Sequence, residues 1–283
     1  MRKTIAVLGG DERQVCLAHL LNADGIEVMT WGLEKGDAPF SVPLDRALEA
    51  DIIVLPLPAC RGERLNLPLT DTVLEQDELW ERLRRNQTIL GGMTGALEKR
   101  LSEYSLSISD YYSREEVQVA NAVPTAEGAI MRAMEETRHT LQGSRCLVLG
   151  YGRIGKILAH RLRCLGAKVT VAARKQSDRA WIEAFDHRAV SIEKLSEGIG
   201  EYDLIFNTVP MSVLDASCLR GAKNGCVLME LASLPGGFDA DAVKRYGLRL
   251  IEERGLPGKV APESAAKAIR DGIYHILEER GDL

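Results

Sequence analysis

The residues best suited to chemistry in this sequence are six that carry the glycine spacing GxGxxG. In such a turn the first glycine permits a tight bend, the second lets the backbone approach a pyrophosphate, and the third lets helix and strand pack closely. The turn follows the apolar run 145–149 and opens a helical pattern, which is the context the motif requires. We therefore predict a dinucleotide site at Gly150, Tyr151, Gly152, Arg153, Ile154 and Gly155.

The end of the next predicted strand, 168–173, indicates which dinucleotide is bound. NAD sites place Asp or Glu there to hold the ribose 2′-hydroxyl. This strand instead ends in Ala173, Arg174 and Lys175, with no carboxylate before Asp178. Two cations suit a 2′-phosphate, and an arginine can grip it with two nitrogens. The sequence predicts NADP as cofactor, and the alternative is a solvated Arg-Lys pair.

Two later loops follow predicted strands at their carboxyl ends, where ligands bind in open α/β sheets. One contains Thr208, Val209 and Pro210, and the other contains Ala232 and Ser233. We expect both to border the nicotinamide, although ordinary turn chemistry would also explain them.

The elements that position these residues alternate between strands and helices, which predicts an α/β fold. We expect two Rossmann-like, doubly wound parallel-sheet domains with a cleft between them. The predicted parts are a flavodoxin- or Rossmann-like substrate domain at 1–123, an interdomain helix at 124–142 capped near Thr125, an NADP-binding Rossmann domain at 143–258, and a C-terminal helix bordering the cleft at 259–283.

The two halves match at a constant offset of 141 positions: Val7-Leu8-Gly9, for example, falls on Val148-Leu149-Gly150. A duplication and shared βαβ physics explain this equally well. The offset also puts Asp11 where the second half has Gly152. A carboxylate at a helix start repels a pyrophosphate, so we expect the first half to have kept the fold without the dinucleotide site.

Composition excludes several classes of function. The 283 residues carry a net charge of -5, so a nucleic-acid partner is not expected. No apolar run approaches the roughly 20 residues of a membrane helix. The six cysteines are scattered and no histidine has metal-ligand spacing, so we expect reduced thiols, a cytoplasmic protein and no metal.

Four further segments carry a resemblance that covers essentially the whole chain: 9–14 (GGDERQ), 121–130 (NAVPTAEGAI), 231–239 (LASLPGGFD) and 255–262 (GLPGKVAP). Together with the glycine turn, they resemble the A subunits of dipicolinate synthase of spore-forming bacteria. The resemblance implies oxidation of dihydrodipicolinate, a branch-point intermediate of lysine synthesis, to dipicolinate during sporulation. It also implies a flavoprotein-like B subunit, and we expect a homo-oligomer.

That reaction requires a site for a small dicarboxylate. Arg13 is the predicted carboxylate clamp, assisted by backbone N–H groups near Gly10 and Asp11, and Thr125 and Lys259 are further predicted contacts. Glu127 is the candidate to take the proton, so Arg13 and Glu127 form the predicted catalytic pair. The alternatives are that Arg13 is a surface helix residue and that Glu127 is a first-turn charge favoured by the helix dipole.

Two other functions fit the same sequence. One is an NADP-dependent dehydrogenase of 2-hydroxy or 2-amino acids, although such enzymes need a well-placed His or Lys that is not evident here. The other is a non-catalytic NADP(H)-binding subunit, because a cofactor site establishes binding and not turnover.

Overall fold

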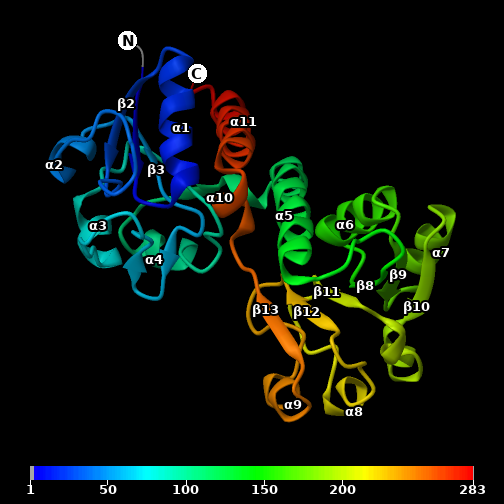
Figure 1. The fold of residues 1–283 in the computed structure, drawn as a ribbon. Helices are drawn as coiled ribbons and strands as arrows, with labels where there is room; N and C mark the ends of the chain where they lie inside the picture. Colours follow the sequence, from blue (N-terminus) through cyan, green and yellow to red (C-terminus); the bar gives the residue numbers. More distant parts are fainter. Residues whose placement is uncertain (1–2, 283) are drawn as a thin grey trace. The chain divides into compact units, whose positions relative to one another are not determined.

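The computed structural model describes residues 3–282, which divide into two compact units (Figure 1). Unit 1 comprises the described residues up to Asn121 together with those from Pro257 onward, and unit 2 comprises Ala122–Leu256. Each unit is described separately.

Unit 1 is built on a parallel five-stranded sheet in the order β2-β1-β3-β6-β7. Its strands are β1 (Thr4–Leu8), β2 (Glu27–Trp31), β3 (Ile52–Val54), β6 (Thr88–Gly91) and β7 (Ile108–Asp110). Its helices are α1 (Glu12–Ala23), α2 (Leu44–Ala47), α3 (Gln76–Arg82), α4 (Glu98–Glu103), the 3-10 turn η1 (Tyr111–Ser113), α10 (Leu256–Val260) and α11 (Pro262–Arg280), and a small hairpin joins β4 (Cys60–Arg61) to β5 (Arg64–Leu65).

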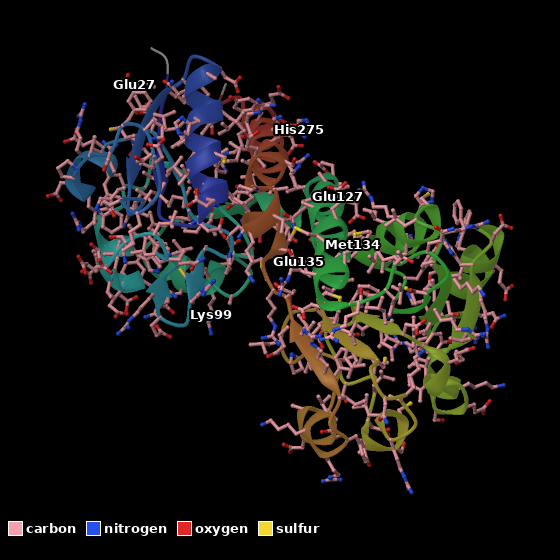
Figure 2. All side chains as sticks on the ribbon, viewed as in Figure 1. Glu27, Lys99, Glu127, Met134, Glu135 and His275 are labelled. Carbon is pink, nitrogen blue, oxygen red and sulfur yellow. The ribbon has the colours of Figure 1, made fainter. Side chains whose placement is uncertain are left out.

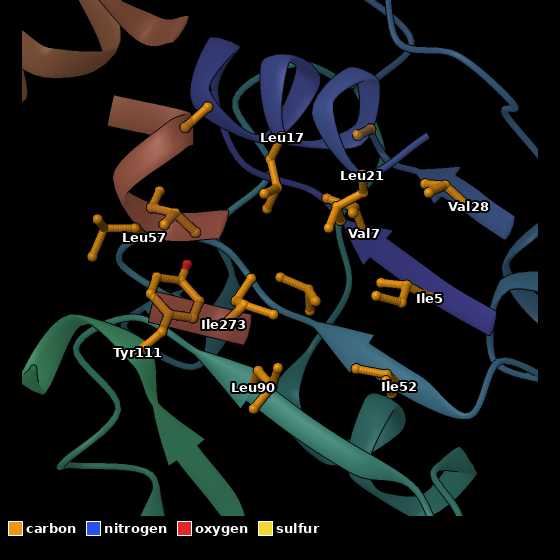
Figure 3. Packing of buried hydrophobic residues seen from close by; sticks show 14 of the residues in the cluster. Ile5, Val7, Leu17, Leu21, Val28, Ile52, Leu57, Leu90, Tyr111 and Ile273 are labelled. Carbon is orange, nitrogen blue, oxygen red and sulfur yellow. The ribbon is translucent and has the colours of Figure 1, made fainter. Parts of the chain in front are cut away.

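Alternation along β1 gives this sheet two buried faces. Ile5 and Val7 point into a hydrophobic cluster that also contains residues of α1 and α11. Figure 3 shows this cluster, of which Tyr111 is a member. Ala6 and Leu8 point the other way, into a cluster that includes Trp80. Successive side chains of a strand point to opposite faces, so a continuous apolar run is typical of a sheet covered on both sides.

Unit 2 is built on a parallel six-stranded sheet in the order β10-β9-β8-β11-β12-β13. Its strands are β8 (Arg145–Leu149), β9 (Lys168–Ala173), β10 (Arg188–Ser191), β11 (Leu204–Asn207), β12 (Val227–Glu230) and β13 (Arg249–Glu252). Its helices are α6 (Arg153–Cys164), α7 (Gln176–Ala184), α8 (Ala216–Leu219) and α9 (Ala240–Arg245), with 3-10 turns η2 (Ile192–Glu197) and η3 (Ile199–Glu201).

The predicted fold class of two Rossmann-like, doubly wound parallel sheets is confirmed. The offset of 141 positions also applies to the observed helices, because α1 begins at Glu12 and α6 at Arg153, and both helices have 12 residues. This agreement does not separate duplication from shared physics. The predicted cleft stays a prediction.

One predicted boundary is wrong. The helix expected to start at Pro124 is α5, which runs over Glu115–Glu136 with Pro124 in its interior, so Thr125 does not cap it. Proline in a helix interior lacks one N–H, but its fixed φ is compatible with a helix. The part of α5 up to Asn121 belongs to unit 1, where the side chain of Val117 lies against Gly272 of α11.

The later part of α5 belongs to unit 2, where Arg132 binds Glu253 beyond β13 (Nε to Oε1, 2.6 Å). The segment that includes α11, in contrast, belongs to unit 1. Among the described residues, no helix has both the length and the apolar character needed to cross a membrane.

Candidate functional site

The three glycines of the unit 2 turn have three different surroundings. Gly150 has a φ of +94°, where a Cβ would be strained and would lie 2.7 Å from Oγ1 of Thr208. A Cβ on Gly155 would lie 2.2 Å from the carbonyl oxygen of Gly150, so this position is closed by backbone. Gly152 has nothing within 4 Å of the same point. The open glycine is the one whose role is close approach to a pyrophosphate.

The start of α6 is suited to bind an anion. Gly152 is its N-cap, no side chain caps the helix, and the first turn contains no acidic residue. The first N–H groups of a helix have no partner within the helix, and its dipole favours negative charge there. Beside it, Tyr151 is half-buried, with Nζ of Lys156 5.5 Å from its ring centroid. Arg153 is exposed and Ile154 is half-buried.

The glycine turn lies where the strand order of unit 2 reverses, between β8 and β11. The loop after β11 is tied to the turn, because Thr208 donates from Oγ1 (2.7 Å) and from its N–H (3.0 Å) to the carbonyl of Leu149. Val209 also faces Gly150, because a Cβ added at Gly150 would lie 2.7 Å from Cγ2 of Val209. Pro210 is exposed. Crevices at such switch points bind ligands in open α/β sheets. The structure therefore brings this predicted loop to the glycine turn.

The next loop is organised by a buried carboxylate that the sequence analysis missed. Glu230, at the end of β12, is 3% exposed. Its Oε1 accepts from Nδ2 of Asn207 (2.7 Å) and from the N–H of Ala232 (3.0 Å), and its Oε2 accepts from the N–H of Gly237 (2.7 Å). Three N–H donors thus satisfy both carboxylate oxygens without a cation. Glu230 thus fixes both ends of the loop that contains Ser233.

The end of β9 carries one more cation than the sequence analysis singled out. Arg174 and Lys175 are exposed there, as a ligand contact requires. Arg179, one turn into α7, folds back, and its Nη1 donates to the carbonyls of Ala173 (3.0 Å) and Arg174 (2.8 Å). Arg179 is therefore bound to the backbone of this corner, whereas the side chains of Arg174 and Lys175 are exposed.

In unit 1 the corresponding position is filled by the protein itself. Asp11 is the N-cap of α1 and forms a capping box with Gln14. Arg13 is 6% exposed, and its Nε and Nη2 bind the two carboxylate oxygens of Asp11 at 2.8 Å each. Nη2 also donates to the carbonyl of Leu57 at 2.5 Å. Burial acts to lower the pKa of Arg13, but hydrogen bonding and charge from Asp11 outweigh it and raise that pKa.

These contacts correct two expectations. Arg13 is not a surface helix residue, because it is buried against β3. The N–H groups of Gly10 and Asp11 are also not open to a ligand, because they donate to the carbonyl of Asn66 (2.9 Å) and to Oε1 of Gln14 (3.3 Å). A backbone anion site at this turn is therefore wrong.

The pair Asp11–Arg13 still lies where unit 1 would bind a ligand. Its strand order reverses between β1 and β3, and Arg13 joins the ends of both strands. Gly258 approaches so closely that a Cβ there would lie 2.8 Å from Oδ2 of Asp11, which brings the segment containing the exposed Lys259 to the same edge. Beside the pair, Gln14 is fully buried and its Nε2 has no partner among residues 3–282.

Glu127 and Thr125 lie on α5, and Figure 2 labels Glu127. Glu127 forms an ion pair with Arg161, in the last turn of α6. A helix of this length spans about 18 Å, so the pair is far from the glycine turn at the other end of α6. Thr125 is buried within α5. Glu127 is not a first-turn charge, and its assignment as the proton acceptor is not favoured by the geometry of unit 2.

Groups of three or more His, Cys, Asp or Glu side chains that could hold a metal ion do not occur among the described residues. The residues that could hold a dinucleotide are those of the glycine turn, Arg174 and Lys175 after β9, and the loops that follow β11 and β12.

Comparisons with known proteins match both units. Residues 4–112 match the family model that describes the N-terminal domain of the dipicolinate synthase A subunit. Residues 112–232 match the model described as D-isomer specific 2-hydroxyacid dehydrogenase, NAD binding domain.

Whole-chain relatives agree. The chain is 30% identical over 285 residues to the A subunit of dipicolinate synthase from Bacillus subtilis, covering 97% of this chain and 96% of that protein. The crystal structure of the A subunit of dipicolinate synthase from Bacillus halodurans superposes with a TM-score of 0.89 at 26% identity and 98% coverage of both chains. The crystal structure of the corresponding chain from Bacillus subtilis superposes with a TM-score of 0.85 at 28% identity, covering 99% of this chain and 97% of that one.

Proposed function

Because this chain belongs to the family of dipicolinate synthase A subunits, we propose that it oxidises dihydrodipicolinate to dipicolinate with NADP+ as hydride acceptor. Its dehydrogenase-type NAD-binding domain makes it an oxidoreductase that binds a nicotinamide nucleotide. The observation that carries the proposal is the open Gly152 at an uncapped helix start, within a chain that matches this family from end to end.

The residues present fit the nucleotide. Gly152 and the first turn of α6 would hold the pyrophosphate, and Arg174 and Lys175 would hold the 2′-phosphate of NADP. The loops fixed by Thr208 and by Glu230 would border the nicotinamide, which supplies a hydride acceptor when it is bound. Preference for NADP over NAD is supported by the absence of a carboxylate between Ala173 and Asp178.

The proposed oxidation removes one hydride and one proton from a dihydropyridine ring and leaves an aromatic ring. The hydride passes to the cofactor and the proton to solvent or to a base. Because aromatisation favours the product, the protein needs mainly to orient the ring and bind its two carboxylates. We assign one carboxylate to Arg13. Its Nε and Nη2 are used by Asp11 and Leu57, which leaves Nη1 to donate to the substrate.

Lys259 and Thr125 remain proposed substrate contacts. We also propose, from the family resemblance, that the chain acts in the cytoplasm during sporulation, as a homo-oligomer and together with a flavoprotein-like B subunit.

The test uses the purified full chain with enzymatically generated dihydrodipicolinate and either NADP+ or NAD+, with and without a B subunit. The absorbance of the reduced nucleotide and the formation of dipicolinate are followed together. Coupled formation of both products with NADP+ preferred supports the proposal.

Tight nucleotide binding with no turnover, even with the B subunit present, contradicts the proposal. It would favour a non-catalytic NADP(H)-binding subunit. Turnover of a 2-hydroxy or 2-amino acid in a parallel assay would favour the dehydrogenase alternative. The match to the NAD binding domain of 2-hydroxyacid dehydrogenases is the observation that supports this alternative.

A further inference from the structure

The amino-terminal edge of the unit 2 sheet carries a cavity of about 410 Å³. Three residues that line it, Arg145, Lys168 and Arg188, are the first residues of the neighbouring strands β8, β9 and β10. The glycine turn and Arg174 follow the opposite ends of β8 and β9. Since a five-residue strand spans about 17 Å, this cavity is separate from the nucleotide site.

The charge around the cavity is positive, although the whole chain is acidic. Four cations line it, including Arg163, against two carboxylates, Asp186 and Glu201. Glu201 is shared, because it accepts from Nη1 of Arg145 (2.8 Å) and from Nη1 of Arg188 (2.7 Å). One carboxylate between two guanidinium groups leaves a positive charge.

Lys168 adds a further positive charge to the cavity. It is exposed, and it forms no ion pair among residues 3–282. The register of the sheet places its Cα directly beside that of Arg145. Lys168 and the Arg145–Arg188 pair therefore present their charge along one edge.

A buried histidine supplies an independent observation. His187 lines the same cavity, is 7% exposed, and its Nδ1 has no hydrogen-bond partner among the described residues. Buried polar atoms in folded proteins nearly always have a partner, so an exception calls for an explanation. Burial and the nearby charges of Arg163 and His160 lower the pKa of His187, against an opposing effect of Asp186. The charge of an anion in the cavity would favour the protonated form of this imidazole.

We propose that this cavity binds a small anion with two or more negative charges, held by Lys168, Arg145 and Arg188 and lying close to the buried imidazole of His187. Guanidinium groups bind phosphate and carboxylate oxygens alike, so both a phosphate ester and a polycarboxylate have the required chemistry. The ligand binds together with the dinucleotide, because the two occupy opposite ends of the strands.

The test measures binding of inorganic pyrophosphate and of citrate to the full chain by calorimetry, with saturating NADP+ present so that the glycine turn is occupied. Lys168→Gln removes one positive charge from the cavity. Lys244→Gln is the matched control, since it removes the same charge from an exposed position of α9 that does not line the cavity. We expect Lys168→Gln to weaken binding by about tenfold or more and Lys244→Gln to leave it unchanged. Both variants should unfold at the wild-type temperature.

Histidine NMR gives a second measurement, in which bound anion should raise the pKa of His187. Binding of pyrophosphate but not citrate would identify a phosphorylated ligand, the reverse would identify a polycarboxylate, and either supports the proposal. Failure of both anions to bind, or equal weakening in the two variants, would overturn it.

Discussion

Gly152 and Gly155 differ in what an added methyl group would meet, and this difference separates nucleotide binding from folding. At Gly152 the backbone has a φ of -81° and a ψ of -164°, which alanine adopts without strain, and the Cβ would meet nothing within 4 Å. At Gly155 the Cβ would lie 2.2 Å from the carbonyl oxygen of Gly150. Gly152→Ala should therefore fold normally, whereas Gly155→Ala should destabilise the folded protein.

The expected magnitudes follow from these contacts. Gly152→Ala should leave the free energy of unfolding within about 1 kcal/mol of the wild type, because alanine restricts the unfolded chain but is a poorer N-cap than glycine. Its methyl group would stand where a pyrophosphate approaches and cost about one charged hydrogen bond, or 1.5–3 kcal/mol. The dissociation constant for NADP+ should then rise about 10- to 150-fold. Gly155→Ala should lower the free energy of unfolding by about 1–3 kcal/mol through overpacking.

The measurements are urea denaturation and fluorescence titration with NADPH on the wild type and both variants. The contrast matters more than either value: one variant should lose binding with its stability intact, and the other should lose stability. If Gly152→Ala bound NADPH as tightly as the wild type, the nucleotide would not approach this glycine and the site assignment would be refuted.

Four further substitutions test other parts of the site. Arg174→Ser should weaken NADP+ binding about 10- to 100-fold with little effect on NAD+, and equal loss of both would contradict a 2′-phosphate contact. Glu230→Gln leaves at least one of three buried N–H donors facing an amide NH2, so urea denaturation should show a loss of about 1–3 kcal/mol; unchanged stability would mean that the loop is held by other contacts. Arg13→Gln should raise KM for dihydrodipicolinate more than it lowers kcat, and a wild-type KM would remove the proposed carboxylate contact. Glu127→Gln should change kcat little, because Arg161 holds this carboxylate far from the glycine turn, whereas a fall of about a hundredfold would restore it as the base.

Sequence reasoning predicted the strands and helices of both sheets well wherever an apolar run was bounded by glycine. The strands Arg145–Leu149 and Lys168–Ala173, for example, have the predicted bounds. It failed at Pro124, because proline ordinarily marks a helix boundary. The helix already begins at Glu115 because its residues up to Asn121 pack in unit 1, and such tertiary contacts are not visible in a local pattern. The strands β7 and β10 give little signal in the sequence, since both are short and only partly buried.

The proposed nucleotide site could be inferred from the sequence because its residues, the spaced glycines and the cations at a strand end, are local in sequence. The parts that were missed depend on contacts between distant segments. Nothing near Glu230 in the sequence indicates that Asn207 lies beside it, and the pairing brings together residues from two different strands. The burial of Arg13 likewise depends on Leu57, which follows β3. A signal was available in one respect, since an acidic residue ending an apolar strand needs internal partners.

The carboxylate that caps α1 has a consequence for stoichiometry. The starts of α1 and α6 are equivalent positions in two copies of one architecture, and the first is occupied by Asp11, which Arg13 neutralises. In unit 1 the protein's own carboxylate thus occupies the helix start at which a dinucleotide phosphate would otherwise bind. A titration should therefore saturate at one nucleotide per polypeptide, and in any homo-oligomer the number of cofactors should equal the number of chains.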